Sequence, residues 1–139
     1  MREISIFTDG GSRGNPGPGA IAFVVFENKK MIYKFSKIIG KTTNNLAEYL
    51  AVTAALEWLV KNFSFANVNF LIDSQLVVNQ LTGKFKIKNQ KIKLLTIKIK
   101  NLEKKFSGKI FYRYIPRREN KIADSLINQI LRPVSRLPG

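Results

Sequence analysis

Three short apolar runs, separated by turn-forming residues, open the chain and most constrain its fold. Residues 3–9 alternate between apolar and polar side chains, which is the pattern of a half-buried strand. The glycine- and proline-rich segment GGSRGNPGPG marks a turn, and residues 20–27 and 31–39 predict two further strands joined by a second turn. Strands in such close succession predict an antiparallel meander.

The remainder of the chain alternates between helices and strands. Apolar residues at steps of three and four predict a long helix over residues 45–61, with Asn44 or Asn45 as its N-cap. The later elements are a strand over 67–73, a short helix from Ser74 to Thr82–Gly83, a helix over 90–106, a strand over 109–115 and a helix over 121–131. This order predicts an α/β fold, a mixed five-stranded sheet with helices packed on it. We expect one domain over residues 1–131 and a tail over 132–139.

The chain contains neither cysteine nor histidine. Disulfides, thiol nucleophiles and triads that need an imidazole are therefore excluded. Any bound metal must be held by oxygen ligands, which favours Mg²⁺ or Mn²⁺ over zinc. No apolar run approaches the roughly 20 residues that span a bilayer, and the first residues are too polar for a secretory leader, so a cytoplasmic protein is expected.

Positive charge dominates the composition. Lysine and arginine number 24 against nine acids, which gives a formal net charge of +15. This excess predicts a polyanionic partner, because cationic side chains gain affinity by releasing counterions from phosphates. A lysine-rich solvated surface without a partner is the alternative interpretation. That alternative would not explain where the few acids lie.

Four of the acids form a candidate site. Asp9 and Asp73 each end an apolar strand, and a helical crossover would make these strands parallel, with neighbouring strands about 4.8 Å apart. Glu48 and Asp124 each lie in the first turn of a predicted helix. Either of these two, taken singly, is explained equally well by the helix dipole. The four together predict carboxylates that share a divalent cation, since crowded carboxylates otherwise repel one another.

Four segments carry a family resemblance: FTDGGSRGNPGPGAIAFVV, TTNNLAEYLAVTAALEWL, LIDSQLVVNQLTGKFKIKN and RRENKIADSLINQIL. In this order and over nearly the whole chain, they resemble type 1 ribonuclease H. The resemblance implies a catalytic domain whose sheet has the strand order 3-2-1-4-5, with strand 2 antiparallel and helices on both faces. It also implies hydrolysis of the RNA strand of an RNA–DNA hybrid, which leaves 5′-phosphate and 3′-hydroxyl ends.

The same resemblance implies the catalytic and metal-binding residues. Carried over position by position, the metal-binding quartet of the family corresponds to Asp9, Glu48, Asp73 and Asp124. The implied chemistry uses two Mg²⁺ ions, for which Mn²⁺ would substitute, about 3.5–4 Å apart on either side of the scissile phosphate. One ion would activate the attacking water and the other would stabilise the leaving 3′ oxygen.

Substrate contacts are also implied by the resemblance. Backbone groups in the turn after Asp9 would meet the RNA ribose, whose 2′-hydroxyl distinguishes RNA from DNA. Other side chains would contact the RNA strand, hold a phosphate of the DNA strand, or pack on a deoxyribose. In that order, the positions are Gly11, Ser12 and Arg13 for the turn, Asn44 and Gln75 for RNA, Asn15, Lys41 and Thr43 for the phosphate, and Phe85 for the sugar. Asn15 and Asn44 could instead shape a turn and a cap, and Phe85 could belong to the core.

Two features depart from the pattern of many relatives. The separate basic helix and loop that some relatives insert is not expected here, although ten lysines and only Glu103 as an acid lie between Lys84 and Lys109 inclusive. The histidine that many relatives have before the last helix is missing, and residues 116–121 read PRRENK. Either Arg118 or Glu119 takes over part of its role, or the metals and the substrate phosphate suffice. Arg118 is favoured as a group that holds a product phosphate.

Three other functions compete with this prediction. A non-catalytic hybrid-binding module would be expected to lack part of the acidic quartet. An integrase, transposase or junction resolvase shares acids at strand ends but not the TTNN segment before Glu48 or the turn after Asp9. A structural or RNA-binding protein that acts through charge alone needs no carboxylate cluster. A monomer is the default expectation for the oligomeric state.

Overall fold

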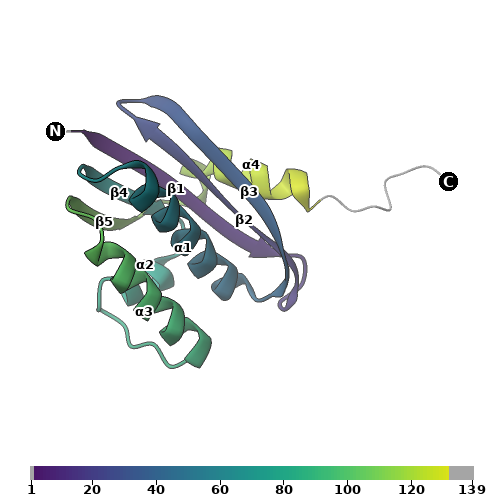
Figure 1. Cartoon of the computed structure of the whole chain (residues 1–139). Coiled ribbons are helices and arrows are strands. Elements are labelled where there is room, and N and C mark those ends of the chain that lie inside the picture. The colour runs from purple at the N-terminus through teal and green to yellow at the C-terminus, as the bar shows by residue number, and fades with distance from the viewer. Residues whose placement is uncertain (1, 132–139) are drawn as a thin grey trace.

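The computed structural model describes residues 2–131, so the tail predicted over residues 132–139 lies outside the described residues. A five-stranded sheet forms the centre of the fold, and helices cover it (Figure 1). The strands are β1 (Glu3–Ser12), β2 (Gly17–Glu27), β3 (Lys30–Thr42), β4 (Asn67–Ile72) and β5 (Lys109–Tyr114). The helical elements are α1 (Asn44–Asn62), α2 (Gln75–Leu81), α3 (Gln90–Lys104), the short 3-10 helix η1 (Arg117–Glu119) and α4 (Lys121–Ile130).

The sheet has the order β3-β2-β1-β4-β5. Strand β2 is antiparallel to both of its neighbours, whereas β4 is parallel to β1 and to β5. The predicted mixed sheet and its strand order are therefore confirmed. Strands β1 and β3 extend beyond their predicted ends, because Ser12 pairs with Gly19 and Thr42 pairs with Gly17. The added strand ends consist largely of glycine and polar residues, so a pattern of apolar side chains does not predict them. They still pair, because backbone hydrogen bonds need no apolar side chain.

An apolar cluster lies on each face of the sheet. On one face, Ile4 and Phe23 belong to the larger cluster, together with Leu56 of α1. On the other face, Val24 of β2 packs with Ile127 of α4. In Figure 1, α1, α2 and α3 lie on one side of the strands and α4 lies across the sheet from them. This arrangement confirms helices on both faces.

Helix α1 begins one residue earlier than predicted, and its N-cap is Thr43. The Thr43 hydroxyl accepts a hydrogen bond from the Leu46 backbone N–H at 3.2 Å. The prediction that Asn44 or Asn45 would cap this helix is therefore wrong. The reason lies in the tertiary structure, because the side-chain oxygen Oδ1 of Asn44 instead accepts from the Ser12 backbone N–H at 3.0 Å.

A single helix, α3, connects α2 to β5. Its apolar stripe packs inward, with Ile92 and Ile99 buried, whereas its lysines are exposed. Among residues 2–131, no helix is both long enough and apolar enough to cross a membrane.

Candidate metal centre and nucleic-acid interface

Two of the predicted acids meet where strands β1 and β4 separate. The last paired residues of these parallel strands are Thr8 and Ile72, so Asp9 and Asp73 each occupy the position directly after the last paired residue. Asp9 lies inside β1 rather than at its end, because β1 continues to pair with β2. Asp9, Glu48 and Asp73 each offer one carboxylate oxygen, and these three oxygens lie within 4.8 Å of one another. The structure therefore brings together three of the four predicted acids.

Glu48 reaches this cluster because α1 passes very close to β1. A Cβ atom at Gly10 would lie only 2.2 Å from the Ala47 carbonyl oxygen, so glycine is required for this approach. The Gly10 backbone N–H donates to Glu48 Oε1 at 2.7 Å. Because the helix starts at Asn44, Glu48 lies in its second turn rather than the first. The helix dipole, which acts within the first turn, therefore explains its position poorly.

Burial and mutual repulsion raise the proton affinity of the cluster. Burial first, and then the charges of Asp73 and Asp124, raise the pKa of Asp9 to about 7. Burial, followed by repulsion from Asp9 and Asp73, also raises the pKa of Glu48 well above its ordinary value. Such carboxylates are unstable together as anions unless a cation neutralises them.

Two buried carboxylate oxygens in the cluster have no hydrogen-bond partner. Oδ1 of Asp9 and Oδ1 of Asp73 accept no hydrogen bond from the residues that the structure describes. Side-chain oxygens held this closely, with no nitrogen or sulfur ligand among them, fit a hard divalent cation. The residues present therefore fit the metal that the sequence predicted.

Asp124 lies at the edge of the same hollow, in the first turn of α4 as predicted. Its side chain is 35% exposed and is linked to the cluster through Arg117. Arg117 Nη1 lies 3.1 Å from Asp124 Oδ1, and Nη2 lies 3.7 Å from Asp73 Oδ1. Burial lowers the pKa of Arg117, but the attraction of Asp73 and the other acids outweighs it and raises the pKa above its ordinary value.

Arg117 and Asn120 are site residues that the sequence analysis missed. The Asn120 side-chain amide is buried and donates to the Thr8 carbonyl at 2.8 Å and to Asp73 Oδ2 at 2.9 Å. It thereby fixes one acid and joins the start of α4 to β1. The signal in the sequence was weak, because an asparagine before a helix is usually read as a cap.

Arg118 does not lie with the acids. It lines a separate hollow of about 240 Å³ beside Phe7 and Phe26, on the face of the sheet that α4 covers. The turn of η1 directs the two consecutive arginines to different surroundings, and Arg117 is the one that meets the acids. Sequence reasoning could not distinguish them, because adjacent residues in a loop have no periodic pattern.

The turn after Asp9 forms the rim of the acidic hollow, whose volume is about 330 Å³ and which is lined by Gly11, Ser12, Arg13 and Asn44 among others. Besides its bond to Ser12, Asn44 donates its backbone N–H to Asn15 Oδ1 at 3.0 Å. Arg13 donates to Asn128 on α4 at 2.8 Å. These contacts fix the turn against α1 and α4, and they place the predicted RNA-contacting turn beside the acids.

A second hollow, of about 550 Å³, brings together Lys41 and Thr43 with Asn89 and Lys91 at the start of α3. Asn15 is not among its lining residues. The remaining predicted contacts are exposed: Gln75 begins α2 next to Ser74 of the acidic hollow, and Phe85 is 52% exposed. The alternative that Phe85 belongs to the core is therefore wrong.

The strand order and the buried carboxylate cluster define a nuclease-like α/β domain with a candidate metal centre. A family model described as "Reverse transcriptase-like" matches residues 7–130. Ribonuclease HI of Halobacterium salinarum is 35% identical over 130 residues, which is 93% of this chain and 64% of that protein. A bifunctional protein of Mycobacterium tuberculosis is 36% identical over 131 residues, and the match covers 93% of this chain but 35% of that protein. The chain thus spans less than two thirds of the length of each of these relatives.

Solved structures agree with the sequence matches. The crystal structure of RNase H1 from Halobacterium salinarum superposes with a TM-score of 0.86 at 35% identity, covering 93% of this chain and 97% of that one. LC11-RNase H1, solved in complex with an RNA/DNA hybrid, gives a TM-score of 0.86 at 38% identity, with coverage of 91% and 94%. The chain belongs to the type 1 ribonuclease H family.

Proposed function

We propose that this protein is an endoribonuclease that hydrolyses the RNA strand of RNA–DNA hybrids and leaves 5′-phosphate and 3′-hydroxyl ends. The observation that carries the proposal is the convergence of Asp9, Glu48 and Asp73, whose oxygens lie within 4.8 Å of one another. The relatives named ribonuclease HI, and the neighbour bound to a hybrid, support the same activity. We expect it to act as a monomer in the cytoplasm, as a catalytic domain over residues 1–131.

The residues that would hold the metal are Asp9, Glu48 and Asp73, with Asp124 as a fourth ligand. Mg²⁺ is the expected ion, and Mn²⁺ should substitute, because both prefer carboxylate oxygens. When bound, a pair of such ions supplies an activated water and stabilises the leaving oxygen. Asn120 holds Asp73 in place through its hydrogen bond to Oδ2, and the Gly10 backbone does the same for Glu48.

Arg117 is the candidate for the role that the sequence analysis gave to Arg118. Its guanidinium contacts Asp73 and Asp124, and its side chain is 65% exposed, so it is accessible to a phosphate at the mouth of the site. A guanidinium suits this position because it binds phosphate through paired hydrogen bonds and stays protonated.

Substrate recognition would follow from the two hollows. Beside the acids, the turn of Gly11, Ser12 and Arg13, with Asn44 and Gln75, would contact the RNA strand. The hollow with Lys41 and Thr43 would hold a phosphate of the DNA strand, with Asn15 fixing the backbone of Asn44 nearby. Phe85 is exposed and available to pack on a deoxyribose.

A cleavage assay tests the proposal. Labelled RNA–DNA hybrid, duplex RNA and duplex DNA are incubated with the protein in Mg²⁺, Mn²⁺ or EDTA. We expect cleavage of the RNA strand of the hybrid, none of duplex DNA, and none in EDTA. Asp9→Asn and Asp73→Asn should each nearly abolish turnover while hybrid binding stays intact. An Asp9→Asn protein with parental turnover would contradict the scheme, and a wild-type protein that binds hybrid without cutting it would favour a non-catalytic module.

A further inference from the structure

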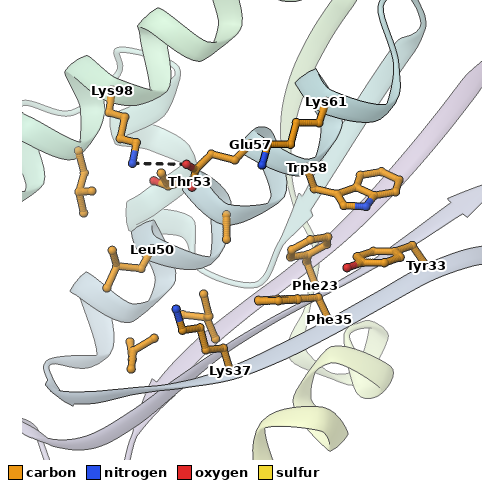
Figure 2. Close-up of a pocket in the computed structure, with 14 residues that line it drawn as sticks. Phe23, Tyr33, Phe35, Lys37, Leu50, Thr53, Glu57, Trp58, Lys61 and Lys98 are labelled. Atoms are coloured by element: carbon orange, nitrogen blue, oxygen red, sulfur yellow. Dashed lines mark ion pairs between the residues drawn. The ribbon is translucent and has the colours of Figure 1, made fainter.

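Three consecutive residues of α1 face three different neighbours. Glu48 joins the acids, and Leu50 lines a groove of about 430 Å³ between β3 and α1 (Figure 2). Tyr49, between them, is buried and does not line that groove. Its hydroxyl donates to Gln80 Oε1 on α2 at 2.6 Å. A hydrogen bond therefore ties α1 to α2 at the residue next to a candidate metal ligand.

The other end of the Gln80 amide holds a basic segment. Gln80 Nε2 donates to the Lys86 backbone carbonyl at 3.3 Å. Lys86 is the middle residue of the KFKIK segment, residues 84–88, which forms neither helix nor strand. One amide thus links α1, through Tyr49, to the centre of a segment that has no regular structure of its own.

Backbone and capping contacts fix both ends of the KFKIK segment. The backbone N–H groups of Lys84 and Phe85 donate to the Asn79 carbonyl at 2.8 and 3.0 Å. Gly83 makes the turn before them with a φ of +83°, which favours glycine. At the other end, the side chain of Asn89 caps α3. Since these contacts lie at the ends, the Gln80 contact is the one that holds the middle.

The KFKIK segment presents an aromatic ring among cations. Phe85 is 52% exposed, and the flanking Lys84 and Lys86 are exposed too. Ile87 instead packs, partly buried, against the larger apolar cluster. A ring available for a deoxyribose, with lysines beside it for the neighbouring phosphates, suits the DNA strand of the proposed substrate.

We propose that Gln80 is a positioning residue for the DNA strand of the hybrid, and that Tyr49 orients its amide. The two hydrogen bonds fix Phe85 relative to the acids around Glu48, so that one hybrid can meet both. A preorganised segment loses less entropy on binding, which improves affinity rather than turnover. Glu48 is held separately by the Gly10 N–H, so the chemistry does not depend on Gln80. The inference rests on the proposed function, because it takes the hybrid as the ligand.

Fluorescence anisotropy with a labelled RNA–DNA hybrid tests the proposal. Each variant is made in Asp9→Asn protein and measured in EDTA, so that binding is read without cleavage. Gln80→Met removes both hydrogen bonds at a similar side-chain length, and Tyr49→Phe removes one of them but keeps the ring. The matched control is Thr82→Val, which removes a 2.8 Å hydrogen bond from the Thr82 hydroxyl to the Val78 carbonyl at the end of the same helix.

We expect Gln80→Met to raise the Kd for the hybrid about fivefold, which is roughly the worth of one hydrogen bond. Tyr49→Phe should raise it about two- to threefold, and Thr82→Val should leave it unchanged. In Phe85→Ala protein, which lacks the ring to be positioned, Gln80→Met should change the Kd by less than about twofold. Equal effects of Gln80→Met with and without the ring would overturn the proposal, as would equal weakening by Thr82→Val.

Steady-state cleavage separates positioning from chemistry. With Asp9 intact and Mg²⁺ present, Gln80→Met should raise KM about as much as Kd and change kcat by less than about twofold. Thermal melting will check that Gln80→Met and Thr82→Val are folded. A fall in kcat at unchanged KM would contradict the positioning role. If the wild type cut no hybrid, the proposed function would fail, while the binding series would still decide the role of Gln80; a failure of Asp9→Asn to bind the hybrid would overturn both.

Discussion

At the scale of single residues, the loop before α4 gives two neighbouring arginines different surroundings. Arg117 lies against Asp73 and Asp124, whereas Arg118 lies in the hollow beside Phe7 and Phe26. A cation next to the acids lowers their mutual repulsion and offers a partner to phosphate. The two arginines therefore form a matched pair for testing what the loop contributes to the reaction.

Replacing each arginine with alanine should separate their roles. Arg117→Ala is expected to lower kcat for hybrid cleavage about tenfold or more, because a charge-assisted contact of roughly 1.5–3 kcal/mol is lost. Arg117→Lys should recover part of the rate, since it restores the charge but not the paired hydrogen bonds. Arg118→Ala serves as the control and should change kcat much less. A larger loss of kcat in Arg118→Ala than in Arg117→Ala would return the role to Arg118.

The raised pKa of Asp9 makes the stability of the metal-free protein depend on pH. Its pKa is about 7 in the folded state, against an ordinary value of 3.8, and the pKa of Glu48 is raised too. Between roughly pH 4 and 7 the folded state therefore binds more protons than the unfolded state, so stability falls as pH rises. For Asp9 the loss reaches at most about 4 kcal/mol, at about 1.4 kcal/mol per pKa unit.

Urea unfolding in EDTA across this pH window measures the effect. The free energy of unfolding should fall more steeply with pH in the wild type than in Asp9→Asn, which cannot ionise at this position. Saturating Mg²⁺ should offset the loss, because a ligand that binds only the folded state stabilises it. Identical pH slopes for the wild type and Asp9→Asn would show that the folded-state pKa of Asp9 is not raised.

At the scale of elements, the packing of α1 on β1 sets the geometry of the site. Gly10 allows the backbone of α1 near Ala47 to approach the strand, and its N–H holds Glu48 in the same contact. One residue on, Gly11 has far more room, since a Cβ there would lie 3.9 Å from the nearest atom, Asn44 Oδ1. Two adjacent glycines thus differ sharply in what an added methyl group would meet.

Gly10→Ala should lower the free energy of unfolding by about 2–4 kcal/mol, because the strand or the helix must shift to admit the methyl group. Gly11→Ala is the control and should change it by less than about 1 kcal/mol. Urea denaturation of both variants compares them directly, and cleavage by Gly10→Ala should fall along with stability as Glu48 moves. Equal stabilities of the two variants would mean that α1 does not pack on β1 this closely.

At the scale of the whole molecule, charge separates into an acidic hollow on a basic body. The net charge is +15, yet Asp9, Glu48 and Asp73 converge at one end of the sheet. The exposed lysines of α3 and the hollow with Lys41 and Lys91 extend the basic surface. The basic surface attracts the phosphates of a polyanion, whereas the acidic hollow attracts divalent cations that neutralise its carboxylates.

Hybrid binding should therefore weaken steeply with salt. If the protein contacts about six phosphates, Kd should rise by about a thousandfold between roughly 50 and 200 mM monovalent salt. Fluorescence anisotropy with Asp9→Asn and a labelled hybrid in EDTA measures this without cleavage. Lys41→Ala should reduce the slope of log K against log salt by about one, whereas Lys109→Ala should leave it unchanged. A slope near zero would exclude phosphate contacts as the main source of affinity.

Much of the fold could be predicted from the sequence. The strand alternation, the apolar steps of α1 and the turn cluster after Asp9 are all local patterns that can be read along the chain. The family resemblance added the strand order 3-2-1-4-5, which the sheet confirms. Errors fell at element ends, such as the N-cap of α1, where the Asn44 side chain accepts a hydrogen bond from Ser12 of β1.

The sequence by itself determined which chemical groups the protein has: acids that follow apolar runs or lie near predicted helix starts, no histidine or thiol, and an excess of lysine. Only the tertiary structure decided that Arg117 rather than Arg118 meets those carboxylates, that Asn120 anchors Asp73, and that a groove opens between β3 and α1. The physical reason is that the periodic pattern of buried side chains depends on residues that are close together in the sequence. Contacts between loops, and the hollows between elements, depend on how distant segments pack together.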